Sequence, residues 1–599
     1  MYYNRLLKWR LIKMKLKKKI IFLLTAVLLV SATMPVTDLQ SRTYQDFQYD
    51  RLKKTAAEKG FVRVIVKLAV PDIEALTAAS IGFKTGNRDS AYIQAAYNAD
   101  LALKESISLT RNMVLHRLNG SHYIVNRTYS TLPYAALSVT AETLEKLGNI
   151  PEVSNIVEDK ATPLPDPVEP SAGDDDISQP QVINTVVIIG ATNAWGVGYT
   201  GAGWYVAVLD TGILTSHDMF QGKHIVEQCF SQGDDWSDGE IGGCPNGRTE
   251  MSGPGSAAHY RNEDRFGHGS HVTGIAAGNN HINRFGIAKD ANIIAVQVFS
   301  YFPDENDVLS WDSDQLSGLE YVYELRNTYN IASVNMSLGG SDKESNYCDS
   351  DLRTAAIANL KAAGIATTVA SGNSSYCDGV NAPACISSAV AVNSTDKNDQ
   401  ESYFGNWHNV MVQLLAPGSS IISAEPTGNS DYSSRSGTSM SAPHAAGAWA
   451  ILKQFDANLS VDNILSLLRA TGKVISSSRC PSAVPESRIN VGNAIFTLLT
   501  LAPPANLSVE QVTNKSFLRT EYINNITWQS NPLNEGKNVT YYKIYVVQGS
   551  QLNLLAQVNN STFQYWHRNV RGREDMTYGV TAVNDQGEES LPIYYSLDL

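Results

Sequence analysis

Three short segments of the sequence carry residue types that can break an acyl bond. In the first, "SRSGTSMSAPHAAGAWAILK" (434–453), Ser439 stands at the mouth of an alanine-rich stretch. Two explanations are open for this serine. It belongs to the cap and first turn of a buried helix made of small residues, or it is a nucleophile placed where helix amides and the positive end of the helix dipole stabilise an oxyanion. The segment alone does not decide between them.

The second and third segments supply a carboxylate and an imidazole. "WYVAVLDTGI" places Asp210 between a buried strand and a Thr-Gly turn, so the carboxylate either caps that turn or orients an imidazole. "RFGHGSHVTGIAAG" places His268 between two glycines, ahead of a small-residue helix. The nearby His271 raises metal binding as an alternative, but no acid or cysteine stands at the complementary helical spacing. We therefore predict no metal ligands in this segment.

Together, the three segments supply the groups that one nucleophilic site needs. A serine hydroxyl needs a base to take its proton, and that base needs a carboxylate to fix its tautomer and stabilise the imidazolium. Asp210, His268 and Ser439 provide these groups in the chain order already known for subtilisin. The sequence thus predicts hydrolysis through an acyl-enzyme.

The central region resembles the subtilisin-like (subtilase) serine proteases. The resemblance rests on five blocks in order, "VAVLDTGI", "GHGSHVTGIAAG", "VNMSLGG", "ASGN" and "GTSMSAPHAAG". It implies a secreted serine endopeptidase with Asp210, His268 and Ser439 as the triad, and a supporting role for His271. It also implies an oxyanion hole formed by the side-chain amide of Asn373 and the backbone N–H of Ser439.

The same resemblance assigns the residues that bind substrate. Two segments should pair with the substrate backbone and wall the specificity pocket, namely Ser337, Leu338 and Gly339 together with Ala370, Ser371 and Gly372. Neither segment contains an acidic residue. We therefore expect a bulky apolar or aromatic P1 side chain rather than a basic one.

The proposed chemistry requires no cofactor, but the family often binds structural calcium. Where the family has an H-P-D sequence with a calcium-ligating aspartate, this chain has His217, Asp218 and Met219. A thioether suits Ca²⁺ poorly. The loop "GNNHINRFG" has the length of a calcium loop, yet Arg284 brings a positive charge. We expect this family site to be altered, while other structural calcium sites remain open.

The elements around these segments predict an α/β fold over residues 175–500. Continuous apolar runs ("WYVAVLD", "NIIAVQVF", "IASVNMSL", "GIATTVAS", "AVAVNS", "VQLLAPG") alternate with helical stretches near 270–277, 314–326 and 352–363. Strands without polar alternation are buried on both faces, which is typical of a parallel sheet. The functional residues should then lie at the carboxyl ends of the strands.

Two further domains flank this region. Residues 33–165, with a core at about 61–160, predict a small α+β unit that resembles the inhibitory propeptide of subtilases. We expect it to act as an intramolecular inhibitor and to be removed by autoprocessing within 161–180. Residues 504–599 predict an all-β sandwich that resembles a fibronectin type III domain, with Trp528 and Tyr578 in its core.

The N-terminus and the cysteines indicate export. Residues 1–32 read as a signal peptide, with a basic run (13–19), an apolar run (20–32) and a small-residue cleavage site, and Met14 is an alternative start. In an oxidising compartment the six cysteines suggest up to three disulfides. Only Cys229–Cys244, which closes a local loop, is predicted as a pair.

Composition excludes several other classes of function. With a net charge of −12 over 599 residues, nucleic-acid binding is not expected. No internal apolar run is long enough for a membrane helix, so we expect no membrane association after signal removal. We expect a monomer whose partners are protein or peptide substrates. The alternative is a catalytically silent extracellular adhesion protein on the same scaffold. An esterase is disfavoured because the nucleophile lacks the G-x-S-x-G elbow.

Overall fold

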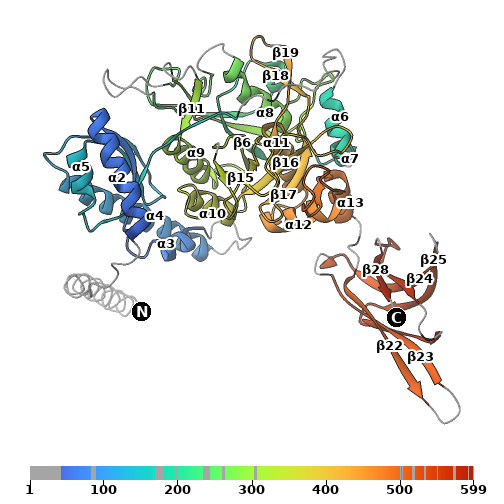
Figure 1. The fold of residues 1–599 in the computed structure, drawn as a ribbon. Helices are drawn as coiled ribbons and strands as arrows, with labels where there is room; N and C mark the ends of the chain where they lie inside the picture. The colour runs from blue at the N-terminus through green and yellow to red at the C-terminus, as the bar shows by residue number, and fades with distance from the viewer. Residues whose placement is uncertain are drawn as a thin grey trace, which may run out of the picture.

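The computed structural model describes most of the chain as three successive units (Figure 1). The described residues are 42–81, 90–165, 168, 181–196, 198–233, 243–259, 264–302, 307–340, 342–499, 501, 504–515, 520–531, 534–548, 551–570, 572, 575–590 and 592–597. The predicted signal peptide and most of the predicted processing tract lie outside the described residues.

The N-terminal unit is a four-stranded antiparallel sheet with helices packed against it. Its strand order is β2-β3-β1-β4. The elements are α2 (Arg42–Lys59), β1 (Val62–Leu68), α3 (Ile73–Ser80), α4 (Ser90–Arg117), β2 (Tyr123–Thr128), β3 (Tyr134–Val139), α5 (Ala141–Leu147) and β4 (Val153–Glu158). Apolar residues of β1 and α4, such as Val64 and Leu103, are fully buried between the layers. The α+β organisation predicted for this segment is therefore present.

The central unit is built on a ten-stranded sheet in the order β20-β21-β17-β16-β14-β12-β6-β9-β7-β8. The eight strands from β21 to β7 are parallel, and the short edge strands β20 and β8 are antiparallel. Their bounds are β6 (Tyr205–Asp210), β7 (Ile225–Phe230), β8 (Glu250–Ser252), β9 (Asn292–Gln297), β12 (Ile331–Met336), β14 (Ala366–Ala370), β16 (Val390–Thr395), β17 (Val412–Pro417), β20 (Lys473–Ile475) and β21 (Glu486–Arg488).

Helices cover both faces of this sheet, and each face has its own apolar core. On β6, Val206 and Val208 join one core while Ala207 and Leu209 join the other, because successive side chains point to opposite faces. The first core contains residues of α6 (Gln181–Ile188), α7 (Ala191–Gly196), α8 (His268–Ala277), α11 (Thr438–Phe455), α12 (Val461–Thr471) and α13 (Val491–Leu499). The second contains residues of α9 (Asp312–Leu325) and α10 (Thr354–Ala362). The predicted α/β class is confirmed.

Smaller sheets lie at the rim of the central unit. They are β10-β11-β5, β13-β15 and β18-β19. The strands are β5 (Ala161–Pro163), β10 (Ser300–Phe302), β11 (Asp307–Trp311), β13 (Lys343–Glu344), β15 (Val380–Asn381), β18 (Ile421–Glu425) and β19 (Asp431–Arg435), with 3-10 turns η3 (Asp218–Phe220) and η4 (Asp264–Gly267).

The C-terminal unit is all β, with two sheets in the orders β22-β23-β26 and β25-β24-β27-β28. The strands are β22 (Ala505–Lys515), β23 (Thr520–Gln529), β24 (Val539–Gln548), β25 (Gln551–Asn559), β26 (Gln564–Val570), β27 (Met576–Asn584) and β28 (Ile593–Leu597). Residues of both sheets share one apolar core that includes Trp528 and Tyr578. The predicted β architecture is therefore present, and its fibronectin-like nature stays a prediction.

Three disulfides pair all six cysteines. Cys229–Cys244 is bonded as predicted, and the other two pairs are Cys348–Cys385 and Cys377–Cys480. Across the described part of the chain, no helix is both long enough and apolar enough to cross a bilayer.

Candidate active site

A buried carboxylate and a histidine meet at the carboxyl end of β6. Asp210 is the last residue of this strand and His268 is the first residue of α8. The imidazole Nδ1 lies 2.9 Å from Asp210 Oδ1 and 3.0 Å from Oδ2. The side chains of the pair are 2% and 11% exposed. Because the carboxylate accepts the Nδ1 proton, the ring takes the tautomer in which Nε2 is the basic nitrogen.

The local sequence explains why these two elements close on each other. The Thr211 hydroxyl donates to Phe266 O at 2.9 Å and accepts the N–H of Gly269 at 2.9 Å, so it ties the end of β6 to the start of α8. A Cβ at Gly269 would lie 2.2 Å from the carbonyl oxygen of Gly212. Only glycine permits this close approach, which sets the His268 ring beside Asp210.

Ser439 is the second residue of α11 and is almost fully buried. Its hydroxyl donates to Ser337 O at 3.3 Å, and the Ser337 hydroxyl donates to Ser439 O at 2.7 Å. Although both side chains are among the described residues, no hydrogen bond joins the Ser439 hydroxyl to His268. Catalytic hydrogen bonds often tighten only in the substrate complex.

Asn373 follows β14 and lies beside the N-terminus of α11. Its Oδ1 accepts hydrogen bonds from the backbone N–H and the hydroxyl of Thr438, each at 2.9 Å. These two donors fix the orientation of the amide, so its NH₂ group points away from Thr438. The Ser439 N–H lies in the first turn of α11, where amides have no acceptor within the helix. Two N–H donors therefore flank the same end of the helix.

A cavity of about 130 Å³ opens beside these donors. Four of the six predicted substrate residues line it, namely Leu338, Gly339, Ala370 and Gly372. The other two lie behind its walls, where the hydroxyl of Ser337 bonds Ser439 O and that of Ser371 bonds Asn406 O. Sequence reasoning missed the lining residues Gly340, Ser374 and Asn381. The described residues around the cavity carry no charged side chain.

The segment that leaves the N-terminal unit runs directly through this site. Strand β5 pairs antiparallel with β11, and the N–H of Leu164 donates to Val308 O at 3.3 Å. Pro163, Leu164 and Pro165 then line the same cavity as Asn373. Further along, Val168 forms an antiparallel bridge with Ser436, three residues before Ser439. Residues 163–165 therefore contact the cavity beside Asn373, and Val168 contacts the segment that leads to Ser439.

The rest of the N-terminal unit docks on α9 through carboxylates. Asp159 accepts the backbone N–H of Ser313 at 3.0 Å, at the start of the helix. Glu320 accepts the backbone N–H groups of Ser130, Thr131 and Leu132. Burial raises the pKa of Glu320. The two units thus share buried, charged hydrogen bonds rather than apolar contacts alone.

His271, for which a supporting role is expected, is buried behind the site. Its Nε2 lies 3.1 Å from Ser433 O, and burial holds its pKa well below the ordinary value. A neutral, hydrogen-bonded ring in the protein interior supports strand β19 against α8. Among the described residues, no group of three or more His, Cys, Asp or Glu side chains has the arrangement of a metal site.

Comparisons with known proteins assign the chain to a family. Residues 201–489 match the Subtilase family of the S8 peptidases. The chain is 30% identical over 360 residues to subtilisin-like protease 1 of Trichophyton verrucosum, a match that covers 59% of this chain and 77% of that protein. The chain belongs to the subtilase family. This subtilase is also 29% identical over 354 residues to the alkaline proteinase of Hapsidospora chrysogena. The match covers 55% of this chain and 74% of that protein.

Among solved structures, the subtilase matches a cold adapted subtilisin-like serine proteinase at 28% identity, with a TM-score of 0.37 over 49% of this chain and 90% of that one. The family relationship supports a serine peptidase and a proteolytic activity.

The loop at the predicted family calcium position does not fit a calcium ion. The Asn280 side-chain oxygen accepts the N–H groups of Ile282, Asn283 and Arg284, so it is used within the loop. The Arg284 guanidinium is buried over the ring of Tyr432, 4.8 Å from its centroid. A buried cation beside the loop opposes a second cation, and calcium prefers oxygen ligands that are free to bind it. These contacts are consistent with an altered calcium site, which stays a prediction.

Proposed function

We propose that this subtilase is a secreted serine endopeptidase in which Asp210, His268 and Ser439 are the catalytic triad. The observation that carries the proposal is the bidentate contact between the His268 Nδ1 and the buried Asp210 carboxylate. It is supported by the position of Ser439 at the first turn of α11, beside Asn373. A buried acid, an oriented imidazole and a serine at a helix N-terminus are the groups that acyl transfer requires.

Each group has one task in the proposed mechanism. Nε2 of His268 takes the proton of the Ser439 hydroxyl as its oxygen attacks the substrate carbonyl, and then gives it to the leaving amine. Asp210 holds the tautomer and stabilises the imidazolium. The amide of Asn373 and the N–H of Ser439 bind the oxyanion, where one donor is worth about 10²–10³ in kcat. Water then repeats the sequence to release the acid, so we assign no cofactor to the chemistry.

The chain is proposed to be made as a zymogen, with residues 33–165 as the inhibitory propeptide. Support comes from residues 163–165, which line the cavity beside Asn373, and from the bridge of Val168 to Ser436. We propose that autoprocessing cuts within residues 161–180, in or next to the segment that contacts the site. We propose that the signal peptide (1–32) directs secretion, that the protein is a monomer, and that 504–599 is a fibronectin type III-like domain.

We also propose a preference for a bulky apolar or aromatic P1 side chain. The cavity beside Asn373 has no charged side chain among its described lining residues, and Leu338 and Ala370 give it apolar walls. A charged P1 side chain would lose its hydration there without gaining a partner. A panel of peptides that differ only at P1 measures this, and a clear preference for Arg or Lys would contradict it.

The decisive experiment compares Ser439→Ala with Ser441→Ala. Both serines are buried in the first turns of α11, but Ser441 is two residues further along. We expect Ser439→Ala to give an uncleaved chain that is not labelled by a fluorophosphonate and does not hydrolyse casein. Ser441→Ala should be processed and labelled. A processed, active Ser439→Ala protein would refute the triad, and a folded wild-type protein without label would favour the silent adhesion protein.

A further inference from the structure

The loop that carries Asn373 is held from behind by the side chain of Asn406. Asn406 is fully buried, and its Oδ1 accepts the N–H groups of Ser374 and Tyr376 at 2.9 and 3.1 Å. Its Nδ2 donates to Ser371 O at 3.2 Å and to Asn381 Oδ1 at 2.7 Å. One side chain thus fixes the backbone on both sides of Asn373 and also a lining residue of the cavity.

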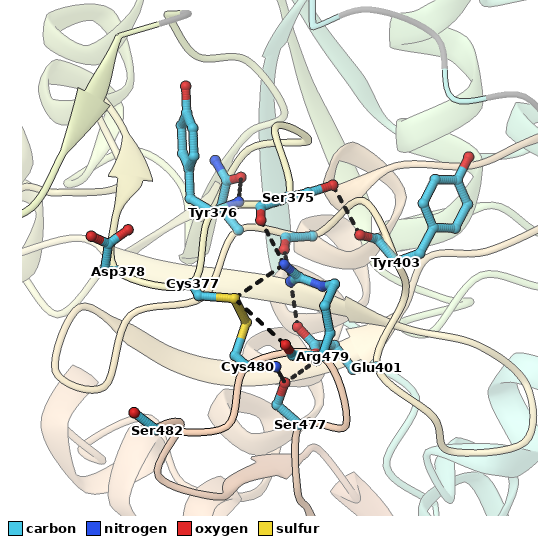
Figure 2. Close-up of a disulfide and its surroundings, with 12 residues drawn as sticks. Ser375, Tyr376, Cys377, Asp378, Glu401, Tyr403, Ser477, Arg479, Cys480 and Ser482 are labelled. Carbon is cyan, nitrogen blue, oxygen red and sulfur yellow. Dashed lines mark hydrogen bonds and ion pairs between the residues drawn. A yellow bond between two sulfur atoms is a disulfide. The ribbon is translucent and has the colours of Figure 1, made fainter.

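A second support reaches the same loop from the outside (Figure 2). The guanidinium of Arg479 donates to Ser375 O at 2.6 Å and to Glu401 Oε1 at 2.6 Å. The next residue, Cys480, is disulfide-bonded to Cys377, two residues beyond Ser375. Figure 2 shows the Arg479 side chain lying between the disulfide and Glu401, so the charged and covalent contacts act on one stretch of loop.

Neither Asn406 nor the disulfide lines the cavity, so neither takes a direct part in the proposed reaction. What they determine is where the loop backbone places Asn373. The oxyanion donor must come within 2.7–3.1 Å of an atom that exists only in the transition state. Displacement of a catalytic group by about 1 Å can cost roughly a hundredfold in rate.

We propose that Asn406 and the Cys377–Cys480 disulfide, with Arg479, are positioning elements that hold the Asn373 amide at the oxyanion site. The inference rests on the proposed function, since it requires Asn373 to be the donor. In the proposed mechanism the cavity walls hold the substrate side chain, whereas the donor acts on the oxyanion of the transition state. Removing the disulfide, whose cysteines do not line the cavity, should therefore lower kcat and leave KM nearly unchanged. Asn406→Ala also releases the lining residue Asn381, so it should raise KM as well as lower kcat.

A double-mutant cycle tests the inference directly. Cys377→Ser/Cys480→Ser and, separately, Asn406→Ala are each combined with Asn373→Ala. In the chain that keeps Asn373 we expect each change to lower kcat about tenfold, which is less than the full loss of a donor. In the Asn373→Ala chain the same changes should cost less than about twofold, because no donor remains to be displaced. Equal losses in both backgrounds would overturn the inference.

The matched control is the disulfide Cys229–Cys244, which joins β7 to its neighbouring loop elsewhere in the unit. Cys229→Ser/Cys244→Ser should lower kcat by the same factor in the chain that keeps Asn373 and in the Asn373→Ala chain, whatever that factor is. The outcomes also separate this inference from the proposed function. If Asn373→Ala alone leaves kcat unchanged, the oxyanion assignment is wrong. If it lowers kcat but the cycle is additive, only the positioning role is wrong.

A measurement on the wild-type protein tests the role of the disulfide even if the cysteine variants do not fold. Cys377 is exposed, whereas both cysteines of Cys229–Cys244 are buried. A mild phosphine reductant followed by alkylation should modify Cys377 before Cys229 or Cys244, as read by peptide mass. We expect kcat to fall in step with Cys377 alkylation at nearly constant KM. Full kcat after complete alkylation of Cys377 would overturn the role of the disulfide.

Discussion

Docking of the N-terminal unit should tighten as the solution becomes more acidic. The prediction rests on Asp312, whose backbone N–H donates to Lys160 O at the start of α9 and whose side chain is only 13% exposed. Burial is the main cause that raises the pKa of Asp312, to about 7 from 3.8, and the nearby Asp351 and Asp159 act in the same direction. Arg353, whose Nη1 lies 3.5 Å away, and Lys160 oppose the rise without cancelling it.

The sign follows from proton binding. A carboxyl whose pKa is higher in the docked state takes up its proton at a higher pH when docked than when undocked. The free energy of docking therefore becomes more favourable as pH falls from about 7 toward 3.8. Between pH 8 and pH 5 the full shift corresponds to about 2–3 kcal/mol, or roughly a hundredfold in Kd. This is the upper bound for docking, because Asp351 and Arg353 stay beside Asp312 in the central unit after undocking. Burial also raises the pKa of Asp314 and Glu320 on the same helix, which adds to the effect.

The assay uses the Ser439→Ala chain with a recognition site for a specific protease inserted between residues 169 and 180. Cutting this site leaves the N-terminal unit held by non-covalent contacts alone, and its Kd is measured from pH 8 to pH 5. Asp312→Asn is the matched variant, because an amide has the same shape and does not titrate. We expect it to lose most of the pH dependence of Kd and keep a smaller slope of the same sign. An unchanged slope, or docking that weakens in acid in both proteins, would refute the reasoning.

Three further outcomes are expected. Asp210→Asn should lower kcat about 10⁴-fold with little change in KM, as in serine-protease triads generally, because the amide favours the wrong tautomer of His268; steady-state kinetics on a peptide ester measure it. Gly372→Ala should destabilise the central unit by about 2–3 kcal/mol, because its backbone φ is +107° and a Cβ would lie 1.8 Å from Asn381 Oδ1. Gly340→Ala, which has open space around it, is the control in thermal unfolding. Burial lowers the pKa of His444 to about 4 from 6.5, so the stability that its neutral form contributes is present above about pH 6.5 and lost as pH falls toward 4. The free energy of unfolding should fall by about 3 kcal/mol over this range. Urea unfolding should show that His444→Gln loses less stability than the wild type as pH falls.

The proposed catalytic residues could be singled out from the sequence because each stands in a segment whose local pattern fixes its place. A buried strand that ends at Asp210 and a glycine-flanked His268 at a helix start need only the parallel sheet to bring them together. Parallel strands could be predicted because they are apolar on both faces. The short antiparallel edges β8 and β20, with three residues each, carry no such pattern and were missed.

The supports of the site were not predictable, because their roles depend on contacts made far along the chain. Asn406 and Arg479 read as ordinary polar loop residues, yet their partners lie 25–104 residues away. The disulfides show the same limit. Cys229–Cys244 closes a separation of 15 residues and could be predicted, whereas Cys377–Cys480 spans 103. Six cysteines allow fifteen pairings, and spacing alone favours only the local one.

The small residues of α11 explain how a buried helix can present the proposed nucleophile. The helix packs against α8, which carries His268, and a Cβ at Gly447 would lie 2.7 Å from both Ala276 O and Ile287 Cβ. Its backbone also accepts a hydrogen bond from the Ser333 hydroxyl of β12, at Ala446 O, 2.9 Å away. Larger side chains along this face would push the two helices apart. Tight packing along the helix body therefore determines the separation of the proposed base and nucleophile at its end.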